Sequence, residues 1–233
     1  MIIGVNGKIN SGKDTVGKIV QYLVNPLEDY TIYDWIESDD LNGRDFNFEI
    51  KKFAGKLKQT ASLLTGIPVK DFEDQEFKKS YLGEEWATVR NHPLNSIPVF
   101  EDVKFNELMS VRELLQKLGT EAMRDGLHTN VWVNALFADY KGPKLSQYNP
   151  SNWIITDMRF PNEMEAIVER KGITIRVTRP VKKSKTTAKL HPSETSLDKA
   201  KFDYEIMNNG TIDNLIDMVR EILIREGIIR NKL

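Results

Sequence analysis

Hydrophobic and polar positions alternate along the chain with two periods, which predicts strands and helices in turn. Residues 1–6 form a short apolar run typical of a strand. After a glycine-containing loop, the apolar positions of residues 16–23 recur at helical spacing until Pro26. The chain is therefore expected to begin with a strand, a loop and a helix.

The pattern is weaker over the next part of the chain. Residues 30–36 have a strand-like composition, and apolar residues alternate with polar ones over 46–50, which predicts a strand. The apolar positions of 57–64 favour a helix that ends at Gly66. Residues 83–109 show no sustained period, so they are interpreted as a surface insertion or a lid over a site.

A helix with two distinct faces is predicted to begin at Ser110. Ser110 suits an N-cap position, and Glu113 follows three residues later as the partner of a capping box. The apolar face is expected to hold Val111, Leu115, Leu118 and Ala122. The polar face is expected to hold a stripe formed by Arg112, Gln116 and Thr120.

The second half of the chain repeats the alternation of strands and helices. Strands are predicted at 153–156, 173–177 and 204–207, and helices at 131–138, 161–172 and 212–224. Such alternation favours a parallel sheet covered by helices on both faces. The terminal helix is amphipathic and can pack on the core or on a second subunit, so a homodimer stays open.

The loop after the first strand has the spacing G-x-x-x-x-G-K, which is the P-loop pattern. Its backbone N–H groups converge on phosphate oxygens, its lysine reaches the β- and γ-phosphates, and the following helix adds its positive N-terminal end. A glycine turn that arose by chance is the alternative. The residues expected to bind ATP are Gly7, Lys8, Asn10, Ser11, Gly12, Lys13, Asp14 and Thr15. The fold class follows: a three-layer α/β P-loop NTPase-like fold with helical and loop insertions.

The magnesium ligand departs from the usual pattern. Asp14 stands where a serine or threonine normally offers its hydroxyl to Mg²⁺, and Thr15 is one residue late. Asp14 can bind the ion directly or through water, or it can cap the helix while Thr15 binds the ion. Asp157 ends a buried strand, like a Walker-B carboxylate, and is the third candidate ligand; a helix cap or turn residue is its alternative.

Three parts of the sequence with arginine or lysine residues are candidates for binding further phosphate groups. Arg159 follows the strand end at Asp157 by two residues, although a surface arginine paired with Glu163 explains it too. The stripe of Arg112, Gln116 and Thr120 can present an arginine to a phosphate and an amide to a base, but a solvated helix face has the same spacing. The four lysines within 182–189 resemble a phosphate-contacting lid, and basic runs are also common in solvated loops.

Composition and charge exclude several classes of function. The chain has 233 residues, a formal net charge of −1, three histidines and no cysteine. Thiolate chemistry is excluded, no histidine pair has metal-ligand spacing, and stable nucleic-acid binding is not expected. The sequence has no secretory signal and no apolar run of about 18 residues, so a cytoplasmic protein without membrane contact is expected. A single kinase domain over 1–233 is predicted, with insertions or lid segments near 25–50, 83–109 and 181–192.

Phosphoryl transfer is the reaction that suits this inventory. The acceptor oxygen of a nucleoside monophosphate is already anionic near neutral pH, so no general base is needed. Catalysis then depends on positioning and charge neutralisation, for which Lys13, Arg112, Asp157 and Arg159 are the candidates.

With these residues in place, the chain resembles the phage-type deoxynucleoside monophosphate kinases, a family of P-loop nucleotide kinases. The family also has an aspartate after the P-loop lysine, as at Asp14. The resemblance runs in order through Ser11–Thr15, Phe53-Ala54, Leu57-Lys58, Ser110–Arg112, Leu118–Thr120, Trp132, Asp157–Arg159 with Glu163, Val177–Pro180, His191–Glu194 and Asn208–Thr211.

The resemblance implies an activity and its site. Lys13 would serve the phosphates of ATP, Arg112 and Arg159 would lie near the nucleotides, and Mg²⁺ would be the metal. Further substrate-binding residues would be Phe53, Lys58, Gln116, Thr120 and Trp132. The product would be a deoxynucleoside diphosphate for DNA synthesis, in the host cytoplasm if a phage encodes the protein. Two alternatives stay open: another small-molecule kinase, such as a dephospho-coenzyme-A kinase, and a P-loop ATPase acting on a nucleic acid or protein.

Overall fold

The computed structural model describes residues 1–26, 28, 30–38, 47–91, 104–142, 151–180 and 195–230. The chain divides into two compact units. We call them the sheet unit, Met1–Phe53 with Val133–Leu233, and the insert unit, Ala54–Trp132. The single kinase domain expected over 1–233 stays a prediction.

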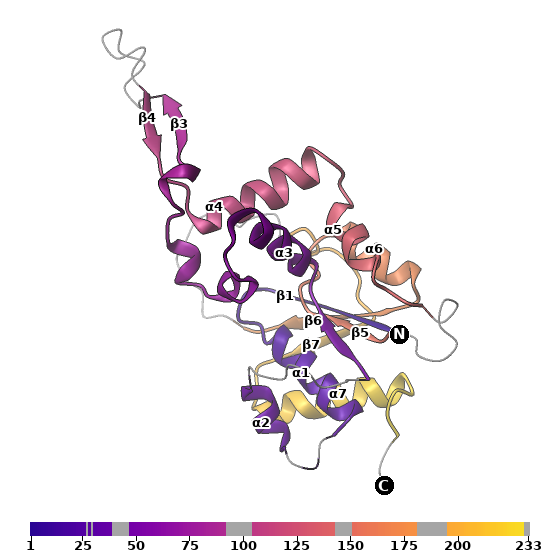
Figure 1. Ribbon diagram of the computed structural model, residues 1–233. Coiled ribbons are helices and arrows are strands. Elements are labelled where there is room, and N and C mark those ends of the chain that lie inside the picture. Colours follow the sequence, from indigo (N-terminus) through magenta and orange to yellow (C-terminus); the bar gives the residue numbers. More distant parts are fainter. Residues whose placement is uncertain are drawn as a thin grey trace. The chain divides into compact units, whose positions relative to one another are not determined.

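The sheet unit is built on five parallel strands in the order β2-β5-β1-β6-β7. This confirms the predicted α/β class, with a parallel sheet flanked by helices (Figure 1). Its elements are β1 (Ile2–Gly7), α1 (Lys13–Val24), α2 (Ile32–Glu37), β2 (Glu49–Lys51), β5 (Trp153–Ile155), α6 (Pro161–Glu169), β6 (Ile173–Thr178), β7 (Tyr204–Met207) and α7 (Ile212–Arg225). Helix α5 (Val131–Phe137) leads into this unit from the insert unit.

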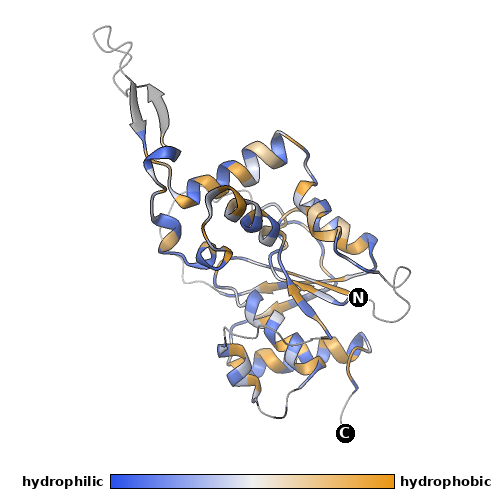
Figure 2. Cartoon of the chain, viewed as in Figure 1, coloured by the Kyte–Doolittle hydropathy of each residue, from blue (hydrophilic) through white to orange (hydrophobic). Residues whose placement is uncertain are grey.

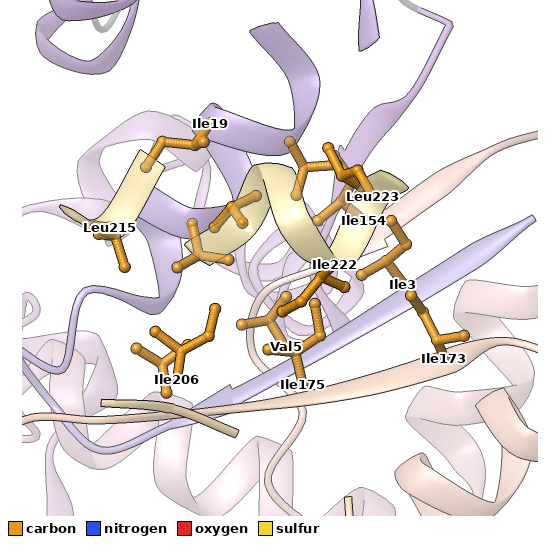
Figure 3. Close-up of a cluster of buried hydrophobic side chains, with 14 of the residues drawn as sticks. Ile3, Val5, Ile19, Ile154, Ile173, Ile175, Ile206, Leu215, Ile222 and Leu223 are labelled. Carbon is orange, nitrogen blue, oxygen red and sulfur yellow. The ribbon is translucent and has the colours of Figure 1, made fainter. Parts of the chain in front are cut away.

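One face of the sheet is covered by α1 and α7. Side chains that alternate along β1, such as Ile3 and Val5, are fully buried and belong to one hydrophobic cluster with Ile222 and Leu223 of α7 (Figure 3). The period of two along a strand places these residues on the same face. The apolar side of the terminal helix therefore packs on the core of its own chain, which answers one of the two options predicted for it.

The opposite face of the sheet has a second core. Ile2 of β1 is buried there with Trp153 and Ile155 of β5, Ile167 of α6 and Leu136 of α5. Because consecutive strand residues point to opposite faces, Ile2 and Ile3 belong to different clusters. The central strands β1 and β5 are thus buried on both sides.

Ile32–Glu37 forms a helix, α2, where the composition of residues 30–36 suggested a strand. The side chains and backbone amides of Thr31 and Asp34 hydrogen-bond to each other in a capping box, which starts α2. Trp35 is 1% exposed, and the rings of Tyr22 and Tyr30 have their centroids 6.2 Å and 6.5 Å from it. The aromatic residues therefore pack a short helix, and the local cap outweighs their preference for strands.

The insert unit consists of short helices, a hairpin and a longer helical segment. Its elements are α3 (Phe53–Thr65, of which Phe53 belongs to the sheet unit), η1 (Val69–Glu73), η2 (Phe77–Lys79), η3 (Glu84–Trp86), β3 (Thr88–Asn91), β4 (Lys104–Glu107), α4 (Val111–Gln116) and η5 (Lys117–Asp125). Strands β3 and β4 pair antiparallel, so ordered strands occur within the segment 83–109, where no period was detected. The core of the unit includes Ala61, Phe72, Leu82, Val111 and Leu118.

The helix predicted from Ser110 begins there but changes its hydrogen-bond pattern. Ser110 Oγ accepts a hydrogen bond from the backbone N–H of Glu113 at 3.2 Å, as predicted for the cap. From Lys117 the chain continues as a π-helix, η5. A π-helix bonds residues five apart, so the assumed α-helical period does not continue. The predicted apolar face was wrong at Ala122, which is exposed, whereas Leu114 is buried.

Among the described residues, buried apolar side chains form two cores in the sheet unit and one in the insert unit. Hydrophobic and hydrophilic positions alternate around α1 and α7 (Figure 2), as expected for helices that cover a sheet. Within the described ranges no helix combines the length and apolar character needed to cross a membrane. The lid predicted at 181–192, with its lysines at 182, 183, 185 and 189, lies outside the described residues, as do Phe46 and the matching segment 191–194.

Candidate active site at the P-loop

The loop between β1 and α1 has the backbone geometry that its glycines predict. Asn10 and Gly12 have positive φ angles of 62° and 96°, and the backbone N–H of Ser11 donates to the carbonyl of Lys8 at 3.1 Å. Gly12 precedes α1 directly and takes a left-handed conformation that few side chains tolerate. The chain thus turns sharply and enters the helix at Lys13.

The centre of this loop contains a polar atom without a partner. Ser11 is 3% exposed, and its buried Oγ has no hydrogen-bond partner among the residues that the structure describes. A Cβ atom at Gly7 would lie only 2.2 Å from this Oγ, so glycine is required for the hydroxyl to fit. Buried hydroxyl groups are normally hydrogen-bonded, and a phosphate oxygen would satisfy this one. The loop residues therefore fit a bound phosphate.

The first turn of α1 carries a cluster of charges. Lys13 Nζ lies 2.9 Å from Asp14 Oδ2, and Lys52 Nζ lies 3.5 Å from Asp14 Oδ1. The hydroxyl of Thr156 donates to the same Oδ1 at 2.9 Å. Partial burial acts to raise the pKa of Asp14, but the hydrogen bond from Lys13, the charges of Lys52 and Lys13, and the Thr156 hydroxyl outweigh it and lower the pKa. Asp14 is therefore a carboxylate at neutral pH.

The contact between Asp14 and Thr156 depends on how closely α1 approaches β5. Gly17 lies on α1 just after Asp14, and a Cβ atom there would be 2.5 Å from Thr156 Cγ2. Thr156 is fully buried directly after β5. A glycine at position 17 therefore lets the helix approach the end of the strand, and the hydroxyl of Thr156 reaches the carboxylate.

Asp157 links two strand ends of the sheet. It lies two residues after β5, and its Oδ1 accepts a hydrogen bond from the backbone N–H of Phe53 at 2.8 Å. Phe53 is the first residue of α3 and follows β2, the neighbour of β5. One oxygen of the carboxylate thus stabilises the start of a helix, and the residue is half-buried at the carboxyl edge of the sheet. Its predicted metal role stays a prediction.

Arg159 lines a cavity of about 290 Å³ beside the P-loop. Its backbone N–H donates to Glu163 Oε2 at 2.7 Å, and Phe160 donates to the same oxygen at 3.0 Å. Glu163 is 4% exposed and closes the first turn of α6 in this way. Both of these hydrogen bonds are donated by the main chain, and Arg159 forms part of the cavity wall.

The cavity also contains residues that the sequence analysis did not select. It is lined by Asn6, Gly7, Lys8, Ile9, Ser11, Arg159, Arg176, Val177, Thr178, Arg179, Leu197 and Asp198. Arg176 donates to the carbonyls of Leu197 and Asp198, and its guanidinium lies 4.3 Å from the ring centroid of Phe202. Arg179 follows β6 at the carboxyl edge of the sheet; it lay within the matching segment Val177–Pro180 but was not assigned a role.

The predicted stripe lies in the insert unit. Arg112 and Gln116 are exposed on α4, and Thr120 is half-buried on η5. An α-helix therefore carries two of these residues and a π-helix carries the third. Their proposed contacts with a nucleotide stay predictions.

The other residues assigned to the substrate by resemblance are mostly buried. Phe53 is 3% exposed, and its ring packs edge-on against Phe137 in the sheet unit. Within the insert unit, the ammonium of Lys58 is paired with the carboxylate of Glu73. The indole N–H of Trp132 donates to the carbonyl of Gly119 at 2.8 Å. These side chains have structural partners in the molecule, and a substrate role for each stays a prediction.

A parallel sheet whose first strand runs through this glycine loop into a helix is the arrangement of the P-loop kinase fold. A family model described as deoxynucleotide monophosphate kinase matches residues 29–219. The chain therefore belongs to the deoxynucleotide monophosphate kinase family. The match begins after the P-loop, so motif and family model rest on different residues.

Three phage proteins illustrate the relationship. The chain is 25% identical to the deoxynucleotide monophosphate kinase of Enterobacteria phage T4, over 95% of this chain and 98% of that protein. It is 24% identical to the deoxynucleoside-5'-monophosphate kinase of Escherichia phage T5, over 92% of each. It is 26% identical to the deoxynucleotide monophosphate kinase of Escherichia phage RB69, over 95% of this chain and 99% of that protein. The similarity thus extends over almost the whole of each chain.

Proposed function

We propose that the protein transfers the γ-phosphoryl group of ATP to a deoxynucleoside monophosphate and so supplies diphosphates for DNA synthesis. The observation that carries this proposal is the P-loop with its buried Ser11 hydroxyl, which no described residue pairs with. Such a hydroxyl suits a phosphate oxygen, and membership of the kinase family supports the choice of reaction. The two arguments are independent because the family match does not include the loop.

The transfer exchanges one phosphorus–oxygen bond for another. A phosphate oxygen of the monophosphate attacks the γ-phosphorus, and the bond to the oxygen bridging the β- and γ-phosphates breaks, leaving ADP. The attacking oxygen carries its own negative charge, so no side chain must remove a proton. We assign Lys13 to the charge on the transferred group and Arg112 and Arg159 to the acceptor or the transition state.

The residues at the loop also suit a magnesium ion. Mg²⁺ in kinases is usually bound by one or two carboxylates together with substrate phosphates, and it neutralises the charge of those phosphates. In the part of the chain that the structure describes, no three histidine, aspartate or glutamate side chains form a complete metal site. Asp14, Thr15 and Asp157 would therefore share the ion with ATP. Thr156 and Lys13 already engage the two oxygens of Asp14, which favours a contact through water.

The protein is proposed to act on free nucleotides in the cytoplasm. A net charge of −1 offers no general attraction to nucleic acids. Helix α7, which could have formed a subunit contact, buries Leu215, Ile216 and Val219 in its own sheet unit. A homodimer would therefore need another surface.

An assay of ADP release across the common ribo- and deoxynucleoside monophosphates tests the proposal. Activity with deoxynucleoside monophosphates is expected, and it should fall strongly in Lys13→Ala. Dephospho-coenzyme A belongs in the same panel as a different acceptor, and a nucleic acid in the absence of monophosphate tests for an ATPase. If no monophosphate accelerates ADP release above background, the proposed function is wrong.

A further inference from the structure

Asn208 connects the edge strand β7 to the P-loop through a hydrogen bond. It follows β7 directly and is 6% exposed. Its side-chain Nδ2 donates a hydrogen bond of 2.9 Å to the carbonyl oxygen of Ser11, and this bond is buried. Because β6 lies between β1 and β7 in the sheet, Asn208 reaches across one strand to contact the loop.

The backbone of Asn208 is itself held in place. Its N–H donates to the carbonyl of Thr178 at 2.7 Å, which extends the pairing of β6 with β7 by one residue. Thr178 lines the same cavity as Gly7 and Ser11. The amide of Asn208 is therefore anchored on the sheet and can act as a fixed support for the loop.

This hydrogen bond sets the orientation of one peptide group. In a trans peptide the C=O and the following N–H point in opposite directions. Since the carbonyl of Ser11 points toward Asn208, the N–H of Gly12 points away from Asn208. A P-loop works by directing such N–H groups at phosphate oxygens. A rotated peptide would present its carbonyl oxygen to the anion.

The side chain of Asn208 also packs closely against Gly12. A Cβ atom at Gly12 would lie 2.4 Å from Asn208 Nδ2, and Gly12 has a φ of 96°. The amide of Asn208 therefore rests directly against the glycine. The left-handed backbone and the neighbouring amide both demand glycine at this position.

We propose that Asn208 is a positioning residue that orients the peptide between Ser11 and Gly12 and so prepares the loop for the triphosphate. Asn208 acts through the loop backbone, so the binding of the monophosphate acceptor is not expected to depend on it. The inference rests on the proposed function because it assumes that the loop binds ATP. Its test measures binding, however, so a failure of the inference can be distinguished from an absence of kinase activity.

The test compares Asn208→Asp with Asn209→Asp by calorimetric titration with magnesium ATP. In Asn208→Asp the new carboxylate keeps the shape of the amide but has no donor for the Ser11 carbonyl. Asn209 is exposed, and its change adds the same charge one residue further along. Asn208→Asp is expected to weaken ATP binding about tenfold or more, and Asn209→Asp by less than about twofold. Asn208→Ala, which adds no charge, should also bind ATP more weakly and serves if the aspartate variant does not fold.

Steady-state kinetics separate positioning from a general structural role. In Asn208→Ala the KM for ATP should rise about tenfold while the KM for the monophosphate changes by less than about twofold. A purely structural residue would lower the melting temperature and affect both substrates alike. Equal effects on both KM values, or unchanged ATP binding in a folded Asn208 variant, would overturn the inference. If the wild-type protein binds ATP but phosphorylates no monophosphate, the proposed function fails and the binding comparison still decides the role of Asn208.

Discussion

The P-loop of the sheet unit and the α4–η5 segment of the insert unit carry candidate residues in different ways. In the P-loop, the backbone itself forms the candidate site, with Asn10 and Gly12 at positive φ and Ser11 buried. On α4 and η5 the candidates are side chains, and Arg112 and Gln116 are exposed. A backbone site depends on a short local motif, whereas a side-chain stripe depends on the helical period of the whole segment.

The supports of both regions come from distant parts of the sequence. The P-loop is held by Asn208 and, through Asp14, by Thr156. In η5, Gly119 packs so closely on Leu57 that a Cβ atom would lie 2.9 Å from Leu57 Cδ2, and its carbonyl accepts the indole N–H of Trp132. We therefore expect that changes to the P-loop weaken the binding of ATP. Changes to η5 are expected to raise the KM for the monophosphate acceptor.

The largest effect is expected at Lys13. Lys13→Ala removes the charge proposed to neutralise the transferred group, so kcat should fall by at least roughly a hundredfold. Lys199→Ala, an exposed lysine in the same unit, is the control and should keep wild-type turnover. Stopped assays of ADP formation at saturating substrates measure both variants. Wild-type turnover in Lys13→Ala would show that the loop is not catalytic.

The second prediction, with a smaller expected effect, compares the ATP affinity of alanine variants at two glycines with positive φ. Gly12→Ala forces a left-handed alanine against Asn208, whereas Gly66, at φ 74°, has open space around its missing Cβ. Gly12→Ala should weaken ATP binding by at least about twentyfold, because strain and the clash both distort the loop.

Gly66→Ala separates strain from the clash. It should cost about 1–2 kcal/mol of folding free energy and leave ATP binding unchanged. Calorimetric titration and urea unfolding of both variants measure these quantities. Equal ATP affinities in the two folded variants would contradict the comparison.

The same two regions show what the sequence could reveal. Strand β7 was predicted at its observed bounds, and helix α1 was predicted to follow the glycine loop, because hydrophobic period and glycine spacing are local properties. The P-loop candidates were likewise found from a short motif. Helix α2 was missed because a capping box between Thr31 and Asp34 outweighed an aromatic, strand-like composition.

Contacts across the fold could not be predicted from one sequence. Asn208 appeared only as part of a resemblance, and nothing in its local sequence indicates that it reaches Ser11. Thr156 and Lys52 meet Asp14 only because their strands end at one edge of a parallel sheet. The π-helix of η5 was missed because period analysis assumes α-helical bonding, so Ala122 was placed on the wrong face.

A third prediction concerns the stripe of the insert unit. Arg112→Ala should raise the KM for the monophosphate about tenfold and leave the KM for ATP unchanged, since a charged hydrogen bond contributes roughly 1.5 kcal/mol. Lys79→Ala, an exposed cation of the same unit, is the matched control. Initial rates over a grid of both substrates give the two constants. If the acceptor KM does not change, Arg112 belongs to a solvated helix face.

The smallest effect should come from the hydrogen bond that Trp132 donates to η5. Trp132→Phe and Trp153→Phe both shorten a buried aromatic side chain. The indole N–H of Trp132 is bonded to a carbonyl, whereas that of Trp153 has no partner within the described part of the chain. Trp132→Phe should therefore lower the free energy of unfolding by about 1 kcal/mol more than Trp153→Phe, as measured by urea unfolding followed by circular dichroism.

The effects of Trp132→Phe on the KM for the monophosphate and on ATP binding distinguish the role of η5 from that of the P-loop. Because η5 carries Thr120, loosening Gly119 should raise the KM for the monophosphate by roughly twofold to threefold, while ATP binding at the P-loop stays as in the wild type. Trp153→Phe provides the contrast, since Trp153 belongs to the core of the sheet unit and the stripe belongs to the insert unit. A change in the ATP constant with an unchanged acceptor constant would mean that η5 does not serve the acceptor, and the division of roles between loop and stripe would be wrong.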